Sequence, residues 1–201
     1  MPPSLFCDSK ALKTRLKRKH NGFKEVTGLG RHGKMFAALT DEVVIKYAEP
    51  EHLPSVIEIN RLELPENYPP SFFMDLLERF PNYFLVAILA KTGEVVGYVM
   101  CRIETGFPSE GGFTIVRKGH VVSLAVKKQF HGKGIGKNLM ASVLSEMIRN
   151  SIDESFLEVR VNNEKAIRLY KALGYRVVRE IPSYYLDGTS GLLMVKKLVK
   201  A

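Results

Sequence analysis

Apolar positions along the 201-residue chain recur with two periods, and the alternation of these periods divides most of the chain into strands and helices. Short runs rich in β-branched and aromatic residues, such as 84–90, are typical of buried strands, whereas 137–150 has the three-to-four spacing of a helix. The pattern predicts strands at 42–48, 82–90, 94–104, 117–126, 155–161, 175–181 and 191–198, and helices at 49–64, 71–80, 137–150 and 162–173. This order, β-α-α-β-β-β-α-β-α-β-β, predicts a single α/β domain with a mixed sheet.

Turn and capping residues sharpen several of these boundaries. Ser71 is a candidate N-cap for the second helix, and Asn162 or Asn163 for the last one, because their side-chain oxygens can accept from free backbone N–H groups. Gly174 is expected to end the last helix. The KTGE segment at 91–94 joins two strands and predicts a hairpin.

Cysteine content and hydropathy exclude several classes of protein. Cys7 and Cys101 are the two cysteines of the sequence, so neither a disulfide scaffold nor a Cys/His metal site is expected. The apolar run at 84–90 is too short to span a bilayer, and no apolar stretch of a secretory signal follows the first residues. We therefore expect a reduced, cytoplasmic protein without a membrane partner.

Positive charge is concentrated at the start of the chain. Residues 1–36 hold nine Lys or Arg and two acidic residues, which accounts for +7 of the net +9. We expect 1–40 to be a basic, flexible extension and 41–201 to be the folded domain. The extension is interpreted either as a solvated arm, as a contact for RNA or the ribosome, or as a transit peptide, although it has little serine.

A glycine-rich turn, QFHGKGIG at 129–136, separates a predicted strand from a predicted helix. Unpaired N–H groups and a partial positive charge at a helix N-terminus favour anions, and glycines let the backbone approach a ligand closely. The spacing differs from that of an ATP-binding P-loop, and no early βαβ unit supports a dinucleotide fingerprint. Taken alone, the turn predicts either a phosphate cradle or a tight turn without a ligand.

Two motifs carry a specific resemblance. Residues 129–134 fit the signature (Arg/Gln)-x-x-Gly-x-(Gly/Ala) of the GNAT N-acetyltransferase superfamily, and NNEKAIRLYKALGY at 162–175 is similar to its downstream helix. The resemblance extends from about 43 to 198 and implies the GNAT fold: a mixed, mostly antiparallel sheet flanked by helices and splayed at an acetyl-CoA site. It implies that acetyl-CoA is contacted by Leu124, Val126, Gln129, His131, Gly132, Lys133, Gly134, Gly136, Lys137, Asn162 and Tyr170.

Three further segments resemble the N-terminal α-amino acetyltransferases of the Ard1/NatA catalytic type. They are LPENY at 64–68, KGHVVSLAV at 118–126 and PSYYLDG at 182–188, and the loop before 117 is most similar to that of archaeal members. The resemblance implies that polypeptide N-termini are the substrate. Nothing in the sequence requires an auxiliary subunit, and the resemblance leaves open whether one is used. It places the substrate against Leu64, Pro65, Glu66, Tyr68, Tyr184 and Tyr185.

The chemistry of an α-amine suits such a site. Its ordinary pKa is about 7.7–8.0, so modest help from a base is enough for direct attack on a thioester, and no covalent intermediate is required. The candidate catalytic groups are Glu66, His120, Glu158 and Tyr170, the last as proton donor to the leaving thiolate. Each also has a structural interpretation: a solvated loop acid, a strand-end histidine, an acid paired with a neighbour such as Arg160, and a core aromatic.

The sequence leaves other functions open. A ribosomal-protein or lysine acetyltransferase would share the same cofactor site, since the superfamily acetylates many amines. A basic RNA- or ribosome-binding module would instead depend on residues 1–40.

Overall fold

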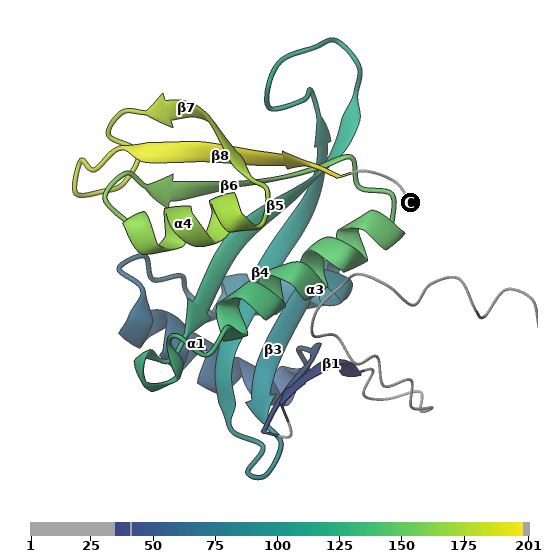
Figure 1. The fold of residues 1–201 in the computed structure, drawn as a ribbon, viewed down its shortest axis with the longest axis vertical. Coiled ribbons are helices and arrows are strands. Elements are labelled where there is room, and N and C mark those ends of the chain that lie inside the picture. Colours follow the sequence, from purple (N-terminus) through teal and green to yellow (C-terminus); the bar gives the residue numbers. More distant parts are fainter. Residues whose placement is uncertain (1–34, 41, 199–201) are drawn as a thin grey trace, which may run out of the picture.

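An eight-stranded sheet in the order β1-β2-β3-β4-β5-β6-β8-β7 forms the centre of the molecule (Figure 1). The computed structural model describes residues 35–40 and 42–198. The strands are β1 (Met35–Thr40), β2 (Val43–Tyr47), β3 (Phe84–Leu89), β4 (Val95–Gly106), β5 (Val116–Val126), β6 (Glu154–Arg160), β7 (Arg176–Ile181) and β8 (Gly191–Lys197). The helices are α1 (Leu53–Glu63), α2 (Pro70–Arg79), α3 (Ile135–Arg149) and α4 (Glu164–Ala172), with short 3-10 turns η1 (Pro50–His52), η2 (Pro81–Tyr83) and η3 (Lys128–Phe130).

Two large hydrophobic cores of the described residues lie on opposite faces of the sheet, beside a smaller cluster of Phe156, Leu193 and Val195. Helices α1 and α2 cover one face, and α3 and α4 cover the other (Figure 1). Side chains of a strand alternate between faces, and β3 shows this directly: Leu85 belongs to the core beneath α3, whereas Phe84 and Val86 belong to the core beneath α1 and α2. The continuous apolar character of 84–90 therefore follows from burial on both sides.

The element order predicted for residues 42–198 is confirmed, with differences at the ends of elements. Strand β1 was not predicted: residues 35–40 were counted with the basic extension, but they pair antiparallel with β2. Backbone pairing with a neighbouring strand is not visible in local composition. The rest of the proposed extension, residues 1–34, and Cys7 lie outside the described residues. None of the helices in the described part of the chain is long and apolar enough to span a membrane.

Two capping predictions can be compared with the structure. Ser71 is not the N-cap of α2; the helix begins at Pro70 after the extended residue Pro69, because a proline at the first position has a helix-compatible φ and needs no N–H partner. Asn163, rather than Asn162, caps α4, since its side-chain oxygen accepts from the N–H of Ala166 at 3.1 Å.

Strands β5 and β6 run parallel and then separate, as predicted for a splayed sheet. β5 pairs with β4 along its length, but it pairs with β6 only over Lys118–His120. A register shift opposite Met100 and Cys101 leaves Val122 as an extra residue in β5, and such a bulge bends and twists a strand. Beyond His120, the side of β5 that faces β6 has no partner strand, which opens the sheet at its centre.

Candidate active site

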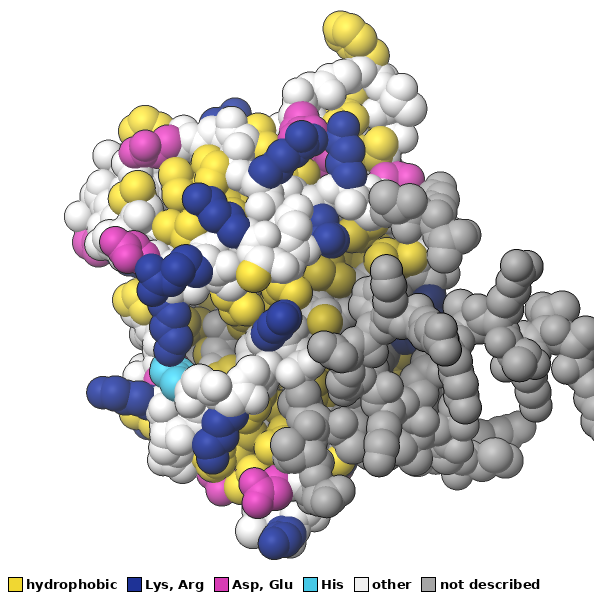
Figure 2. Space-filling model, viewed as in Figure 1, with side chains coloured by type: hydrophobic (Ala, Val, Ile, Leu, Met, Phe, Trp, Pro, Cys, Tyr) yellow, Lys and Arg dark blue, Asp and Glu magenta, His cyan; other side chains and the backbone are white. Residues whose placement is uncertain are grey.

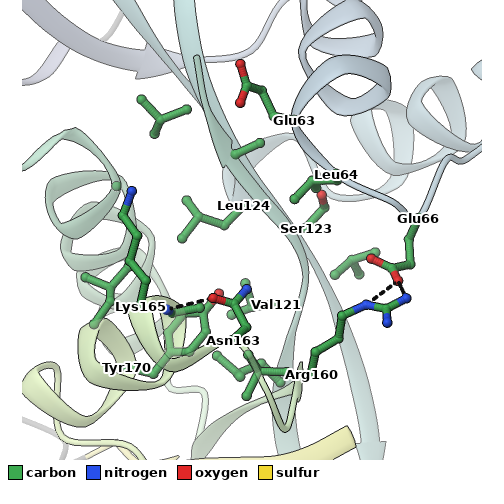
Figure 3. Close-up of a pocket in the computed structure, with 18 of the residues that line it drawn as sticks. Glu63, Leu64, Glu66, Val121, Ser123, Leu124, Arg160, Asn163, Lys165 and Tyr170 are labelled. Atoms are coloured by element: carbon green, nitrogen blue, oxygen red, sulfur yellow. Dashed lines mark hydrogen bonds and ion pairs between the residues drawn. The ribbon is translucent and has the colours of Figure 1, made fainter. Parts of the chain in front are cut away.

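A cleft of about 570 Å³ occupies the gap between β5 and β6. The glycine turn and α4 form one end, β5 and β6 the middle, and the loop after α1 together with the β7–β8 loop the other end. Leu124 lies between α4 and the residues of the α1 loop, and Asn163 and Tyr170 face it from the opposite wall (Figure 3). The cleft thus connects two chemically different ends through an apolar centre.

The glycine turn presents a backbone surface to the cleft. Gly132 and Gly134 adopt φ values of 78° and 76°, which side-chain-bearing residues rarely do, and Gly134 is the N-cap of α3. A Cβ at Gly132 would meet no atom within 4 Å. Among the described residues, none accepts from the N–H groups of Gly132, Lys133 or Gly134. Free donors at a helix N-terminus fit the phosphates of a nucleotide-type cofactor.

Basic side chains surround this end of the cleft. His131 donates from Nε2 to the carbonyl oxygen of Val126 at 2.7 Å, and its Nδ1 accepts from the Lys165 ammonium at 2.9 Å. Lys137, in the first turn of α3, also lines the cleft. Lys and Arg side chains gather over α4 and the glycine turn in Figure 2. The charge favours an anionic ligand at this end.

Tyr170 closes the apolar middle of the cleft. The residue is 9% exposed, and its ring packs edge-on against Tyr175, with centroids 5.9 Å apart. Burial raises the pKa of the Tyr170 phenol well above its usual range, so the hydroxyl stays protonated. No described residue hydrogen-bonds to that hydroxyl. It is therefore available to a molecule bound in the cleft.

His120 and Glu158 form a close pair where β5 and β6 separate. His120 Nε2 and Glu158 Oε2 are 2.7 Å apart, and the imidazole stacks on Phe156 with centroids 4.5 Å apart. Burial acts to raise the pKa of Glu158, but the hydrogen bond and charge of His120, together with Arg102, lower it overall. Glu158 is thus an ionised acceptor that orients the ring, and the buried Nδ1 of His120 has no hydrogen-bond partner among the described residues.

An ion-pair bridge crosses the far end of the cleft. Arg160 donates from Nε and from a terminal nitrogen to Glu66 Oε1, at 3.0 and 2.5 Å, and from the other terminal nitrogen to Asp187 at 2.7 Å (Figure 3 shows the Glu66 contacts). The guanidinium also lies 4.2 Å from the ring centroid of Tyr185. This bridge joins the α1 loop to the β7–β8 loop and narrows the mouth.

Tyrosines complete the wall at this end. Burial, followed by the nearby charge of Glu158, raises the pKa of Tyr184 to about 12, and burial likewise raises the pKa of Tyr185. The Tyr68 hydroxyl donates to the carbonyl oxygen of Val122 at 3.5 Å. The β7–β8 loop therefore presents neutral phenols that can donate hydrogen bonds to a polypeptide backbone, whereas the hydroxyl of Tyr68, which donates to Val122, can act only as an acceptor.

Comparison with known proteins identifies the family. The acetyltransferase (GNAT) family model matches residues 53–175, which is more than half of the chain. The chain belongs to the GNAT acetyltransferase family. It is 44% identical over 160 residues to a protein of Sulfurisphaera tokodaii named N-alpha-acetyltransferase, a match that covers 78% of this chain and 94% of the relative.

Solved structures of similar proteins agree with this membership. Ard1 from Thermoplasma volcanium has a TM-score of 0.66 and 28% identity, covering 79% of this chain and 99% of that one. The NatB acetyltransferase complex bound to CoA and MES contains a chain with a TM-score of 0.65 and 25% identity, covering 77% and 99%. The GNAT resemblance inferred from 129–134 and 162–175 is confirmed.

Most residues that the sequence predicted for the site of this GNAT acetyltransferase line the cleft. They are Leu64, Pro65, Glu66, Tyr68, His120, Leu124, Val126, His131, Gly132, Gly134, Gly136, Lys137, Glu158, Tyr170, Tyr184 and Tyr185. Three others, Gln129, Lys133 and Asn162, do not line it. Asn162 precedes the capping residue Asn163, which lines the cleft instead.

Several cleft residues were not predicted. Asn163 and Lys165 could have been predicted, because they lie inside the 162–175 motif. Arg160 was considered only as a partner of Glu158, whereas it pairs with Glu66 and Asp187, and Glu158 pairs with His120. Strand alternation explains this, since residues two apart on β6 share a face but meet different neighbours. No feature of the sequence predicted that Ser123 would line the cleft.

Proposed function

We propose that this GNAT acetyltransferase transfers the acetyl group of acetyl-CoA directly to the α-amine of a polypeptide N-terminus, through a ternary complex. One observation carries the proposal: a single cleft runs from a glycine-lined anion site to a narrow mouth walled by tyrosines and an ion-pair bridge, and the His120–Glu158 pair lies between them. Two of the related proteins named above support it, one by its name and the other by its bound CoA.

The first end of the cleft fits the cofactor. The N–H groups of Gly132 and Gly134 and the first turn of α3 are placed for its phosphates, with Lys137 and Lys165 as cationic neighbours. The unpaired side of β5 beyond His120 offers backbone groups to its amide-containing arm, as expected for Leu124 and Val126. Acetyl-CoA supplies the acetyl group as a thioester, which an amine attacks without a nucleophilic side chain of the protein.

The second end fits a polypeptide N-terminus. An α-amine is partly neutral near pH 7, since its ordinary pKa is about 7.7–8.0. Glu158 lines the cleft as an ionised acceptor held by Nε2 of His120, so the pair can take a proton from the amine through the Glu158 carboxylate, directly or through water. Glu66 is held by Arg160, and we assign it to the wall that positions the substrate.

We assign Tyr170 to protonation of the leaving thiolate. Its protonated hydroxyl opens onto the apolar middle of the cleft and has no partner among the described residues, so it can donate to the sulfur that leaves. The cysteine Cys101 needs no role in catalysis: it is buried, and burial raises the pKa of its thiol.

We further propose that the protein acts in the cytoplasm and that the basic extension before residue 35 contacts the ribosome, where N-termini emerge. The supporting observation is the positive charge of that extension. Cosedimentation of the full chain with ribosomes tests this proposal, with a variant in which the lysines and arginines at 10–19 are replaced by serine as the comparison.

Acetyl transfer to defined peptides tests the main proposal. The panel varies the first two residues and includes one peptide with a blocked α-amine and a free lysine, with products read by mass spectrometry. We expect modification of free N-termini alone, and a kcat at least tenfold lower for Glu158→Gln but unchanged for the exposed matched variant Glu180→Gln. Modification of only the blocked, lysine-containing peptide would replace the proposal with a lysine acetyltransferase.

A further inference from the structure

A buried asparagine outside the cleft holds the loop that forms its acceptor end. Asn60, on α1, is 1% exposed. Its Nδ2 donates to the carbonyl oxygen of Glu66 at 3.3 Å, and its Oδ1 accepts from the N–H of Tyr68 at 3.4 Å. A single side chain thus satisfies two backbone groups of the loop at 64–68, on either side of Asn67.

The same side chain connects this loop to the strand on which the reaction is proposed to occur. Asn60 Nδ2 also lies 3.0 Å from the hydroxyl of Tyr98, which is fully buried and hydrogen-bonds to Ser123 Oγ at 2.8 Å. Ser123 belongs to the wall of the cleft. The chain Asn60–Tyr98–Ser123 therefore ties α1 to β5 beneath the acceptor loop.

A second tie runs through Tyr68. Its hydroxyl donates to the carbonyl oxygen of the bulged residue Val122, and its ring stacks on Phe72 with centroids 4.8 Å apart. The position of that ring depends on the backbone at Tyr68, which Asn60 holds. Loss of the Asn60 contacts would leave the loop anchored by the ring and hydroxyl of Tyr68 and by the ion pair between Glu66 and Arg160, with no side chain holding its backbone groups.

We propose that Asn60 is a positioning residue that fixes the 64–68 loop against β5 and so sets the affinity for the polypeptide acceptor. Asn60 touches neither the cleft nor the glycine turn, so CoA affinity does not depend on it. This inference rests on the proposed function, because it assigns the loop to the acceptor.

Two variants of Asn60 and one matched control test the inference. Asn60→Ala removes the contacts and leaves space, whereas Asn60→Leu removes them and fills a similar volume with apolar atoms. Tyr175→Phe is the control: it deletes a buried hydrogen bond of 2.7 Å, to Ser155, in the other core. Tyr175 does not line the cleft, and the phenylalanine keeps the ring that packs against Tyr170. We expect both Asn60 variants to raise the peptide KM about tenfold, equivalent to ~1.4 kcal/mol, with CoA Kd within about twofold of wild type.

Hydrogen exchange gives a readout that does not require turnover. Amides at 64–68 should exchange at least tenfold faster in both Asn60 variants and at the wild-type rate in Tyr175→Phe. An unchanged peptide KM, an equal rise in the control, or loss of CoA binding in both Asn60 variants would overturn the inference, the last because Asn60 would then be a general folding residue. If wild type acetylated no peptide, the proposed function would fail, while exchange at 64–68 would still decide whether Asn60 fixes the loop.

Discussion

Substitution of Gly132 separates the cost of backbone strain from the cost of blocking the cleft. Gly132 and Gly93 have φ values of 78° and 74°, and a Cβ built at either position meets nothing within 4 Å. Gly93 lies in the turn between β3 and β4 and does not line the cleft. Gly132→Ala and Gly93→Ala therefore impose the same strain, but only the first places a methyl group in the phosphate cradle.

The strain can be estimated for both variants together. An L-residue in the left-handed region costs about 1–2 kcal/mol. For a chain of this size, Tm falls by about 2–4 °C for each kcal/mol. The two variants should thus lose the same few degrees when no ligand is present.

CoA should distinguish them. At a concentration of 100 times Kd, a ligand stabilises the folded state by ~2.7 kcal/mol, and a tenfold weaker Kd roughly halves that value. We expect Gly93→Ala to keep the full CoA-induced rise in Tm and Gly132→Ala to keep half of it or less. Differential scanning fluorimetry and isothermal titration give the two quantities. Equal CoA affinity in both variants would refute the assignment of this turn to the phosphates.

Three further variants address the remaining parts of the cleft. Because interactions with His120 lower the pKa of the folded-state Glu158 despite burial, the ionised carboxylate stabilises the fold above the unfolded-state pKa of about 4.3, and this contribution is lost as pH falls through the folded-state pKa. Urea unfolding should therefore show a smaller loss of free energy between pH 6 and pH 3 for Glu158→Gln than for wild type, and equal losses would contradict the pairing. Tyr170→Phe should lower kcat by roughly 10–100-fold, while the Kd for CoA from titration stays unchanged. If the variant had the kcat of wild type, Tyr170 would not be the proton donor to the leaving thiolate. Arg160→Met should raise the peptide KM by about tenfold, since it releases Glu66 from the wall of the mouth, and steady-state kinetics with CoA binding as control would show whether the effect is confined to the peptide.

The glycine turn shows which structural features could be predicted from the local sequence. A strand, three glycines at alternate positions and a helix are encoded within 117–150, and each part depends on neighbours in the chain. Their geometry therefore follows from local rules, including the positive φ values that glycine tolerates. The same holds for 162–175, where Asn163 caps α4 and Gly174, at φ 89°, ends it.

Contacts between distant segments could not be predicted in this way. Arg160 lies two residues from Glu158, yet its partner Glu66 is 94 positions away, and Asn60 meets Tyr98 from the next layer. Both pairings depend on the register of β6 and on how α1 packs on the sheet. Lys165 reaches His131 only because α4 and the glycine turn face each other across the cleft.

By itself, the sequence determined the element order over 42–198, the continuous apolar runs of the central buried strands, and the motifs of the cofactor cradle, because these depend on short-range geometry and side-chain type. Tertiary structure alone decided which charges pair at the mouth of the cleft, how Asn60 holds the acceptor loop, and that β1 joins the sheet. The division has a physical reason: hydrogen bonds and ion pairs act over a few ångströms of space, and separation along the chain does not reveal that distance.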